Sequence, residues 1–152
     1  MKAFHLRLLP AVALTVIIPA AARAHTTIWP RESMAGATEK YSIRVPTEGK
    51  VATTAAEIEV PDGVAVETIG APVGWKYELK RKDDRIVAIT FKMDIKPGEF
   101  AEFTFVARNP RDRKELVWGL RQRFADGTST DFTHEPAGIR ATAVVKMTPR
   151  PD

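Results

Sequence analysis

Histidine offers the most distinctive chemistry in this chain, because the 152-residue sequence contains three histidines and no cysteine. The lack of cysteine excludes disulfides, thiolate zinc sites, iron–sulfur clusters and cysteine nucleophiles. His25 is set apart by the residues before it, since Ala22-Arg23-Ala24 has the A-x-A form of a signal-peptide cleavage site. His134 is a lone internal histidine, a kind that more often serves as a surface or capping residue than as a ligand.

The first 24 residues have the features of a secretory signal. Lys2 and Arg7 form a positive start, residues 8–18 are apolar, and Pro19 leads to the small residues before His25. The apolar run is about half of the ~20 residues that a membrane-spanning helix needs, so an uncleaved tether is the less favoured alternative. We therefore predict a cleaved signal peptide over 1–24, a single domain over 25–152 with no membrane span, and a periplasmic or extracellular location.

Cleavage after Ala24 would make His25 the first residue of the mature protein. Such a residue offers two nitrogens, its free α-amine and its imidazole, which can close a small chelate ring on a metal. The amine has an ordinary pKa near 8, and a metal can displace its remaining proton. Cu(II) is the favoured ion, because it tops the affinity order and accepts tetragonal nitrogen and oxygen ligands.

The charge of the chain does not indicate a nucleic-acid partner. There are 23 basic and 19 acidic residues, but Lys2, Arg7 and Arg23 belong to the predicted signal peptide, which has no acidic residue. Residues 25–152 therefore hold 20 basic and 19 acidic residues and are close to neutral. Nucleic-acid binding would call for a clustered basic patch, which the linear sequence does not indicate.

Short alternating segments separated by Gly, Pro and Asp predict an all-β fold. We expect strands near residues 41–45, 58–60, 64–69, 74–79, 87–93, 103–105, 116–124, 128–133 and 141–147, with a tight hairpin at Asp126-Gly127. Seven to nine short strands with regular turn signals are typical of an antiparallel β-sandwich, and helix should be scarce. The aromatic residues expected to fill the core are Trp75, Phe91, Phe103, Phe105, Trp118 and Phe124.

Trp29 is a separate case, because it lies four residues after His25 and directly before Pro30. Two roles stay open for it: packing beside whatever His25 binds, or covering the sheet as a hydrophobic lid.

Catalytic motifs are scarce, and we predict a non-enzymatic protein. Ser129, Asp131 and His134 are near one another in sequence, but no G-x-S-x-G surrounds the serine, and a triad is defined by geometry. The sequence has no glycine-rich phosphate loop and no H-E-x-x-H motif. Single acidic residues alternate with apolar ones, as on the solvated face of a sheet: Glu57, Glu59, Glu78 and Glu102.

An ordered set of motifs along residues 25–127 resembles the YcnI-like copper-binding domain family. The motifs are His25-Thr-Thr-Ile-Trp-Pro30, Arg44-Val-Pro-Thr-Glu48, Glu59-Val-Pro-Asp-Gly63, Pro72-Val-Gly-Trp75, Ile95-Lys-Pro-Gly-Glu-Phe100, Glu102–Pro110 and Asp126-Gly127. Each motif is weak alone, but their order and spacing are fairly specific together. The resemblance implies an exported, immunoglobulin-like sandwich that binds Cu(II) through a brace with one histidine.

In such a brace, the resemblance implies that His25 supplies two nitrogens and a glutamate supplies an oxygen. Glu48 is the first choice, because it occupies the R-V-P-x-E position, and Glu39 is the second. A carboxylate oxygen suits Cu(II) better than Cu(I). The expected function is that of a copper carrier, chaperone or buffer, whose partners are a copper ion and a membrane copper transporter.

One segment departs from the family pattern. The family often has D-W-T close to the metal, whereas this chain has Asp131-Phe132-Thr133, followed by His134. His134 could replace or supplement a ligand, or belong to a loop. Two other functions therefore remain open: an oxidative copper enzyme with a His25 and His134 brace, and a metal-free adhesion or assembly module.

Overall fold

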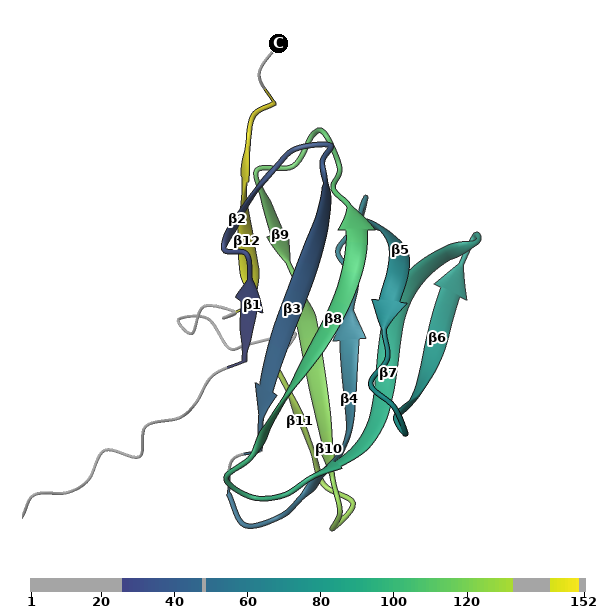
Figure 1. Ribbon diagram of the computed structural model, residues 1–152, viewed down its shortest axis with the longest axis vertical. Helices are drawn as coiled ribbons and strands as arrows, with labels where there is room; N and C mark the ends of the chain where they lie inside the picture. The colour runs from purple at the N-terminus through teal and green to yellow at the C-terminus, as the bar shows by residue number, and fades with distance from the viewer. Residues whose placement is uncertain (1–25, 48, 133–142, 151–152) are drawn as a thin grey trace, which may run out of the picture.

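Twelve strands and no helix make up the described part of this computed structural model, which comprises residues 26–47, 49–132 and 143–150 (Figure 1). The strands are β1 (Thr27–Trp29), β2 (Glu32–Met34), β3 (Thr38–Pro46), β4 (Thr53–Glu59), β5 (Ala65–Gly70), β6 (Lys76–Lys82), β7 (Arg85–Ile95), β8 (Phe100–Arg108), β9 (Glu115–Val117), β10 (Gly119–Phe124), β11 (Ser129–Asp131) and β12 (Val144–Thr148). Twelve strands appear where seven to nine were expected, because the three-residue strands β1 and β2 were not predicted and the segment predicted over 116–124 forms both β9 and β10. Over the same residues, no helix could cross a membrane.

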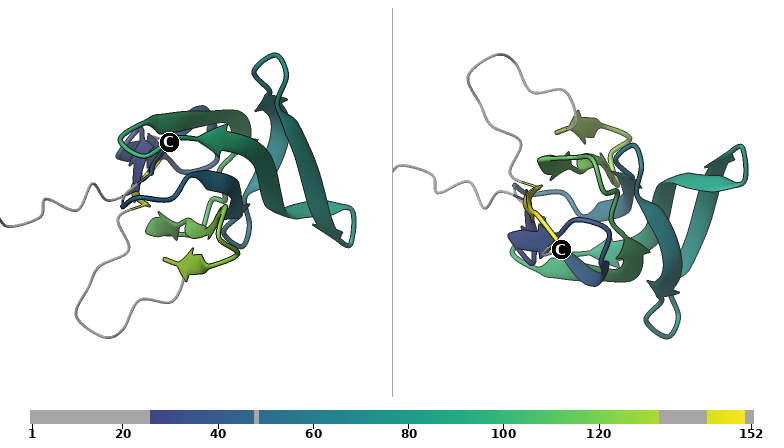
Figure 2. Two further views of the ribbon diagram at one scale, coloured as in Figure 1. Left: turned by 90° about the horizontal axis from the view of Figure 1, so that it is seen from below. Right: turned by 90° about the horizontal axis from the view of Figure 1, so that it is seen from above.

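The strands form an immunoglobulin-like sandwich, as predicted. One sheet has the order β1-β3-β8-β5 and the other has β11-β10-β4-β7-β6, while β2-β12-β9 forms a small third sheet. All pairs in the two larger sheets are antiparallel, and only β2 with β12 is parallel. Figure 2 shows the layers end-on, with the β6–β7 hairpin projecting to one side.

Period-two alternation explains how these strands build the core. In β3, Tyr41, Ile43 and Val45 are buried, and the residues between them are not. Tyr41 lies opposite Phe105 and Ile43 lies opposite Phe103 on β8, so that their side chains share the inner face. The second sheet meets this face through Phe91, whose ring stacks on that of Phe103 with 4.4 Å between centroids.

Most of the predicted core aromatics are confirmed. Phe91, Phe103, Phe105 and Trp118 are at most 1% exposed, whereas Trp75 and Phe124 are half-buried. The long stripe predicted over residues 116–124 is divided into β9 and β10 at Trp118, but its alternate residues do face inward. Among the described residues, the buried indole nitrogen of Trp118 has no hydrogen-bond partner.

The predicted hairpin at Asp126-Gly127 joins β10 to β11. Gly127 has φ of 84°, a left-handed conformation that glycine adopts without steric cost. The Asp126 carboxylate accepts hydrogen bonds from the backbone and hydroxyl of Thr128, at 3.0 and 2.6 Å. Aspartate and glycine therefore each supply what this turn needs.

Candidate metal centre

The three residues with the strongest predicted ligand chemistry, His25, Glu48 and His134, lie outside the described residues. Their immediate neighbours Thr26, Thr47 and Phe132 are described, and these define the surroundings of the candidate site. Within the described part of the chain, no group of three His, Asp or Glu side chains is arranged to hold a metal ion.

The pairing of β1 with β3 brings the neighbours of His25 and Glu48 to one end of a sheet. The strands are antiparallel, with Thr27 opposite Arg44 and Trp29 opposite Ser42. Thr26 directly precedes β1, and Thr47 directly follows the last residue of β3, Pro46. The start of an antiparallel strand lies beside the end of its partner, so these two threonines extend from the same end of the pair.

Thr47 is fixed in place by hydrogen bonds in several directions. It is 4% exposed, and its hydroxyl donates to Thr53 Oγ1 at 2.8 Å and lies 3.3 Å from the Ile95 carbonyl. Its backbone N–H donates to the Glu99 carbonyl at 2.9 Å, and its own carbonyl accepts from Gly98 N at 3.2 Å. Thr47, the residue directly before position 48, is therefore buried and held in place by these hydrogen bonds.

Gln122 extends this buried network from the opposite sheet. It is 3% exposed, and its amide nitrogen donates to the Pro46 carbonyl at 2.9 Å and to Thr53 Oγ1 at 3.3 Å. No role was predicted from the sequence for Gln122, Thr47 or Thr53. The available signal was a glutamine within an otherwise apolar inward stripe, since a buried amide must find partners.

Two buried hydroxyls lie beside position 25. Thr26 is 4% exposed, and the side-chain oxygens of Thr26 and Thr27 are buried with no hydrogen-bond partner among the described residues. An unpaired buried hydroxyl costs roughly 1–3 kcal/mol. Over the described part of the chain, this end of β1 therefore presents polar atoms that no neighbour satisfies.

Glu39, the second choice for the oxygen ligand, occupies the other end of β3. Its carboxylate accepts a hydrogen bond from Ser33 Oγ at 2.8 Å and another from the backbone of Lys40 at 3.1 Å. Ser33 in turn accepts from Asn109, whose Oδ1 accepts from the Tyr41 hydroxyl at 2.6 Å. Glu39 thus terminates a polar chain that ties β2, β3 and the end of β8 together.

Trp29 is not part of the core. It is 53% exposed, the Trp29–Pro30 peptide bond is cis, and the Arg31 guanidinium lies 5.1 Å from the indole centroid. The lid interpretation does not fit so exposed a side chain, and the described residues do not test the alternative of packing beside a ligand of His25.

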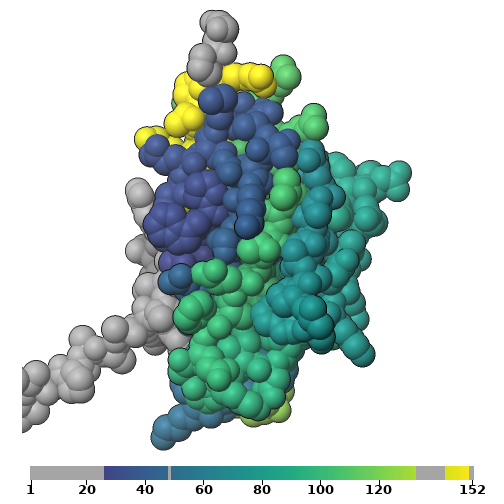
Figure 3. All heavy atoms as spheres, viewed as in Figure 1, coloured from purple at the N-terminus to yellow at the C-terminus, as the bar shows by residue number. Residues whose placement is uncertain are grey.

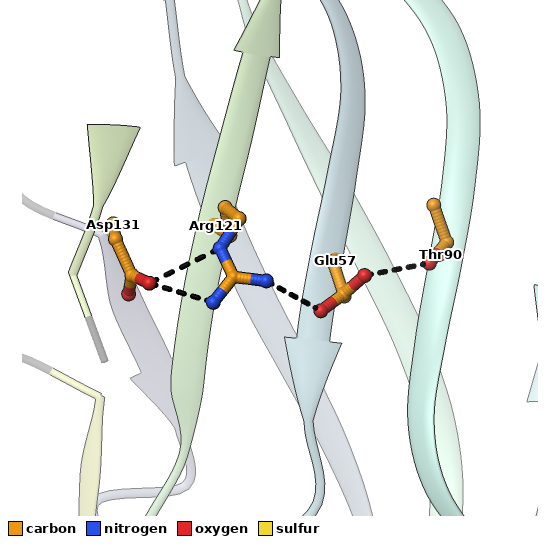
Figure 4. Close-up of polar contacts among 4 residues, drawn as sticks. All are labelled: Glu57, Thr90, Arg121 and Asp131. Atoms are coloured by element: carbon orange, nitrogen blue, oxygen red, sulfur yellow. Dashed lines mark hydrogen bonds and ion pairs between the residues drawn. The ribbon is translucent and has the colours of Figure 1, made fainter. Parts of the chain in front are cut away.

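Phe132, which stands where the family often has tryptophan, packs half-buried against the core. Its backbone N–H donates to the Leu120 carbonyl at 2.7 Å. The preceding residue is held by the ionic network in Figure 4, in which Arg121 donates to Asp131 Oδ2 at 2.7 and 3.1 Å and to Glu57 Oε1 at 3.1 Å.

This ionic network explains the role of single acidic residues that alternate with apolar residues along the strands: their carboxylates pair with cations of neighbouring strands. Thr90 donates to the second oxygen of Glu57 at 3.4 Å, so the network spans β11, β10, β4 and β7. The hydrogen bond with Asp131, followed by its negative charge, raises the pKa of Arg121 above its ordinary value. Other strand carboxylates also face cations, with Glu78 paired to Lys92 and Glu102 paired to Arg44.

Comparison with known proteins adds independent information. A family model described as a domain of unknown function, DUF1775, matches residues 25–150. The chain is 34% identical over 152 residues to a protein of Bacillus subtilis (strain 168) named Copper-binding protein CutI, with 97% of this chain and 74% of that protein covered.

Solved structures support the fold. An uncharacterised protein from Nocardia farcinica, described as having an immunoglobulin-like fold, superimposes with a TM-score of 0.69 at 23% identity, covering 81% of this chain and 97% of that one. A cohesin module from a Clostridium perfringens glycoside hydrolase gives a TM-score of 0.54 at 15% identity, covering 83% and 97%. At these identities, the likeness concerns the fold alone.

Proposed function

The chain belongs to the YcnI-like family of DUF1775 domains, and from this premise we propose that it is an exported protein that carries or buffers Cu(II). The relative named as a copper-binding protein supports the copper-binding role. Export, the oxidation state of the metal and delivery to a membrane copper transporter are parts of the proposal that rest on the signal-like residues 1–24 and on the ligand chemistry.

The proposed site consists of the amine and imidazole of His25 and the carboxylate of Glu48. The observation that supports it most directly is the β1–β3 register, because Thr26 and Thr47 extend from the same end of this strand pair. His25 is two residues from Thr27, a reach of at most about 7 Å. The hydrogen bonds that fix Thr47 would also restrict the carboxylate that follows it.

The same register argues against Glu39 as the oxygen ligand. Five residues separate Glu39 from Arg44, the partner of Thr27, which is about 17 Å along an extended strand. Thr26, the residue before Thr27, lies on the other side of Thr27 from Glu39, toward the Pro46 end of β3. In addition, both carboxylate oxygens of Glu39 already accept hydrogen bonds.

The donor set and its surroundings fit Cu(II). Two nitrogens and a carboxylate oxygen are ligands that suit this ion, and tetragonal geometry leaves positions for water. The buried hydroxyls of Thr26 and Thr27 are available to hydrogen-bond a ligand or a bound water at this end of β1. Copper is the cargo here, and we assign the protein no catalytic step.

A titration of matched carboxylate variants tests the choice of ligand. For a chain that begins at His25, we expect Glu48→Gln to weaken Cu(II) binding by about tenfold or more, as even outer-shell partners do, and to change the electron paramagnetic resonance spectrum. Glu39→Gln should leave affinity and spectrum unchanged, while lowering thermal stability through the Ser33 contact.

The reverse pattern, with copper affinity lost only in Glu39→Gln, would assign the oxygen ligand to Glu39. Oxygen consumption with copper and a reductant separates a carrier from the oxidative enzyme alternative. A carrier should show only slow background turnover.

A further inference from the structure

The β6–β7 hairpin concentrates positive charge in a domain that is otherwise slightly acidic. Residues 76–92 contain six basic and three acidic residues, so the other residues of 25–152 hold 14 basic and 16 acidic residues. Figure 2 shows this hairpin projecting beyond the two layers, and the space-filling view in Figure 3 shows its teal atoms standing out at the right-hand side of the molecule. Almost all of β6 is exposed, with only Leu79 half-buried.

Three lysines of β6, Lys76, Lys80 and Lys82, share one face, because their positions differ by even numbers. The register shift near Lys80 does not disturb this alternation, because its extra residue, Val87, lies on β7. Within the described part of the chain, the ion pair of this hairpin joins Lys92 to Glu78 and leaves these three lysines unneutralised.

The remaining cations and the hairpin tip are fixed by backbone contacts. Arg81 donates to the Asp84 carbonyl at 3.0 Å, and Arg85 donates to the Val64 carbonyl at 3.3 Å. Neither contact neutralises the charge of its guanidinium. The three lysines of β6 are spread over about 20 Å, and the face that they share also carries Glu78, whose charge is paired with Lys92.

Apolar groups are exposed at the base of the same hairpin. Val73, in the loop that enters β6, is fully exposed, and Tyr77 is 42% exposed with its ring 6.1 Å from that of Phe91. Tyr77 lies on the opposite face of β6 from Lys76, so these apolar groups flank the lysines at the base of the hairpin. An exposed aliphatic side chain and a tyrosine beside several lysines are suited to the boundary between water and lipid.

We propose that the β6–β7 hairpin docks the domain on an anionic lipid surface. Lysines are point charges on flexible stems, and their spread along a strand suits diffuse negative charge better than a single carboxylate. Lysines on an edge strand also prevent pairing with other chains. That role alone predicts no preference between anionic and neutral lipid, and the proposal is independent of copper binding.

Vesicle sedimentation of the chain without residues 1–24 tests this. Vesicles of three parts phosphatidylcholine to one part phosphatidylglycerol should bind the protein at 0.1 M salt, and vesicles of pure phosphatidylcholine should not. Binding should fall sharply at 0.5 M salt, because the charges are then screened. The triple variant Lys76→Gln, Lys80→Gln, Lys82→Gln should partition on the order of 100-fold more weakly, at about 1 kcal/mol for each lysine.

A matched control removes three exposed cations elsewhere: Lys40→Gln, Lys114→Gln and Arg123→Gln. This control should bind like the parent chain. Equal losses in both triple variants would overturn the proposal, since net charge rather than the hairpin would then govern binding. Equal binding to both vesicle types would also overturn the proposal. Binding only to soluble polyglutamate, and not to vesicles, would overturn it too, because it would indicate an acidic polypeptide partner.

Discussion

Replacing Gln122 with leucine tests whether the buried network beneath position 48 supports the fold. Gln122→Leu nearly preserves side-chain volume, so the main change is the loss of the amide that donates to the Pro46 carbonyl and to Thr53 Oγ1. Thr53 is fully buried and Pro46 is half-buried, so water has little access to replace the lost donor.

The expected cost comes mainly from the Pro46 carbonyl, because Thr53 Oγ1 keeps the hydrogen bond that it accepts from Thr47. An acceptor left without its donor costs roughly 1–3 kcal/mol, and the gain from burying leucine offsets part of this cost. We expect a net loss of about 1 kcal/mol in the free energy of unfolding. For a domain of about 130 residues, this corresponds to roughly 4 °C in Tm.

Urea and thermal unfolding, each measured without copper, give this loss directly. Arg123→Gln is the matched control, because Arg123 is the next residue on β10 and is exposed, and its change should stay within about 0.5 kcal/mol. If our site is correct, Gln122→Leu should also weaken Cu(II) binding several-fold, through the Pro46–Thr47 segment. Stability equal to that of the parent chain, or an equal loss in the control, would refute the reasoning.

Two further predictions concern the rest of the domain. Burial raises the pKa of the Tyr41 phenol above its ordinary value, so the folded state holds this proton more tightly than the unfolded chain. The protonated Tyr41 phenol therefore contributes fully to the free energy of unfolding below about pH 10, and this contribution is lost as pH rises through the folded pKa. Tyr41→Phe should flatten the alkaline loss of stability seen in urea titrations from pH 9 to 12. Gly63→Ala should cost roughly 2–3 kcal/mol in unfolding free energy, because Gly63 has φ of 88° and an added Cβ would lie 2.9 Å from Pro110 Cβ. Gly74→Ala, at φ of 86° with nothing within 4 Å of the added Cβ, should cost only about 1 kcal/mol, and equal costs for the two would contradict the steric argument.

Much of the fold could be predicted because strand signals are local. The alternation in residues 41–45 and 103–105 depends only on burial of one face, and the structure pairs these segments in β3 and β8. The Asp126-Gly127 turn depends on two adjacent residues, and it too was confirmed. The short strands β1 and β2 were not expected, because three residues give too little periodicity to detect.

The surroundings of the candidate site could not be predicted in the same way. Gln122 and Pro46 are 76 residues apart, and only the packing of one sheet on the other brings them together. From the sequence, Glu48 was preferred to Glu39 only by its place in the R-V-P-x-E motif. The β1–β3 register brings Thr26 and Thr47, the described neighbours of His25 and Glu48, to the same end of the strand pair, and the proposed site rests on this arrangement.

The positive charge of the β6–β7 hairpin could not be predicted from the amino-acid composition. Residues 25–152 are close to neutral in net charge, but this total conceals a cationic strand on an otherwise slightly acidic domain. Linear order gave little sign of this, because Asp83 and Asp84 interrupt the basic run. The lysines align on one face only when β6 is paired with β7.

The central claim is that His25 binds copper through its own amine, and it is tested most directly by comparing two chains that differ by one residue. One begins at His25, and the other carries a single alanine before it, with every other residue unchanged. Cu(II) titration followed by electron paramagnetic resonance should show one ion bound through nitrogen and oxygen in the first chain. In the extended chain, affinity should fall by orders of magnitude, because the amine no longer belongs to the histidine chelate. Equal affinity and identical spectra in the two chains would contradict the account.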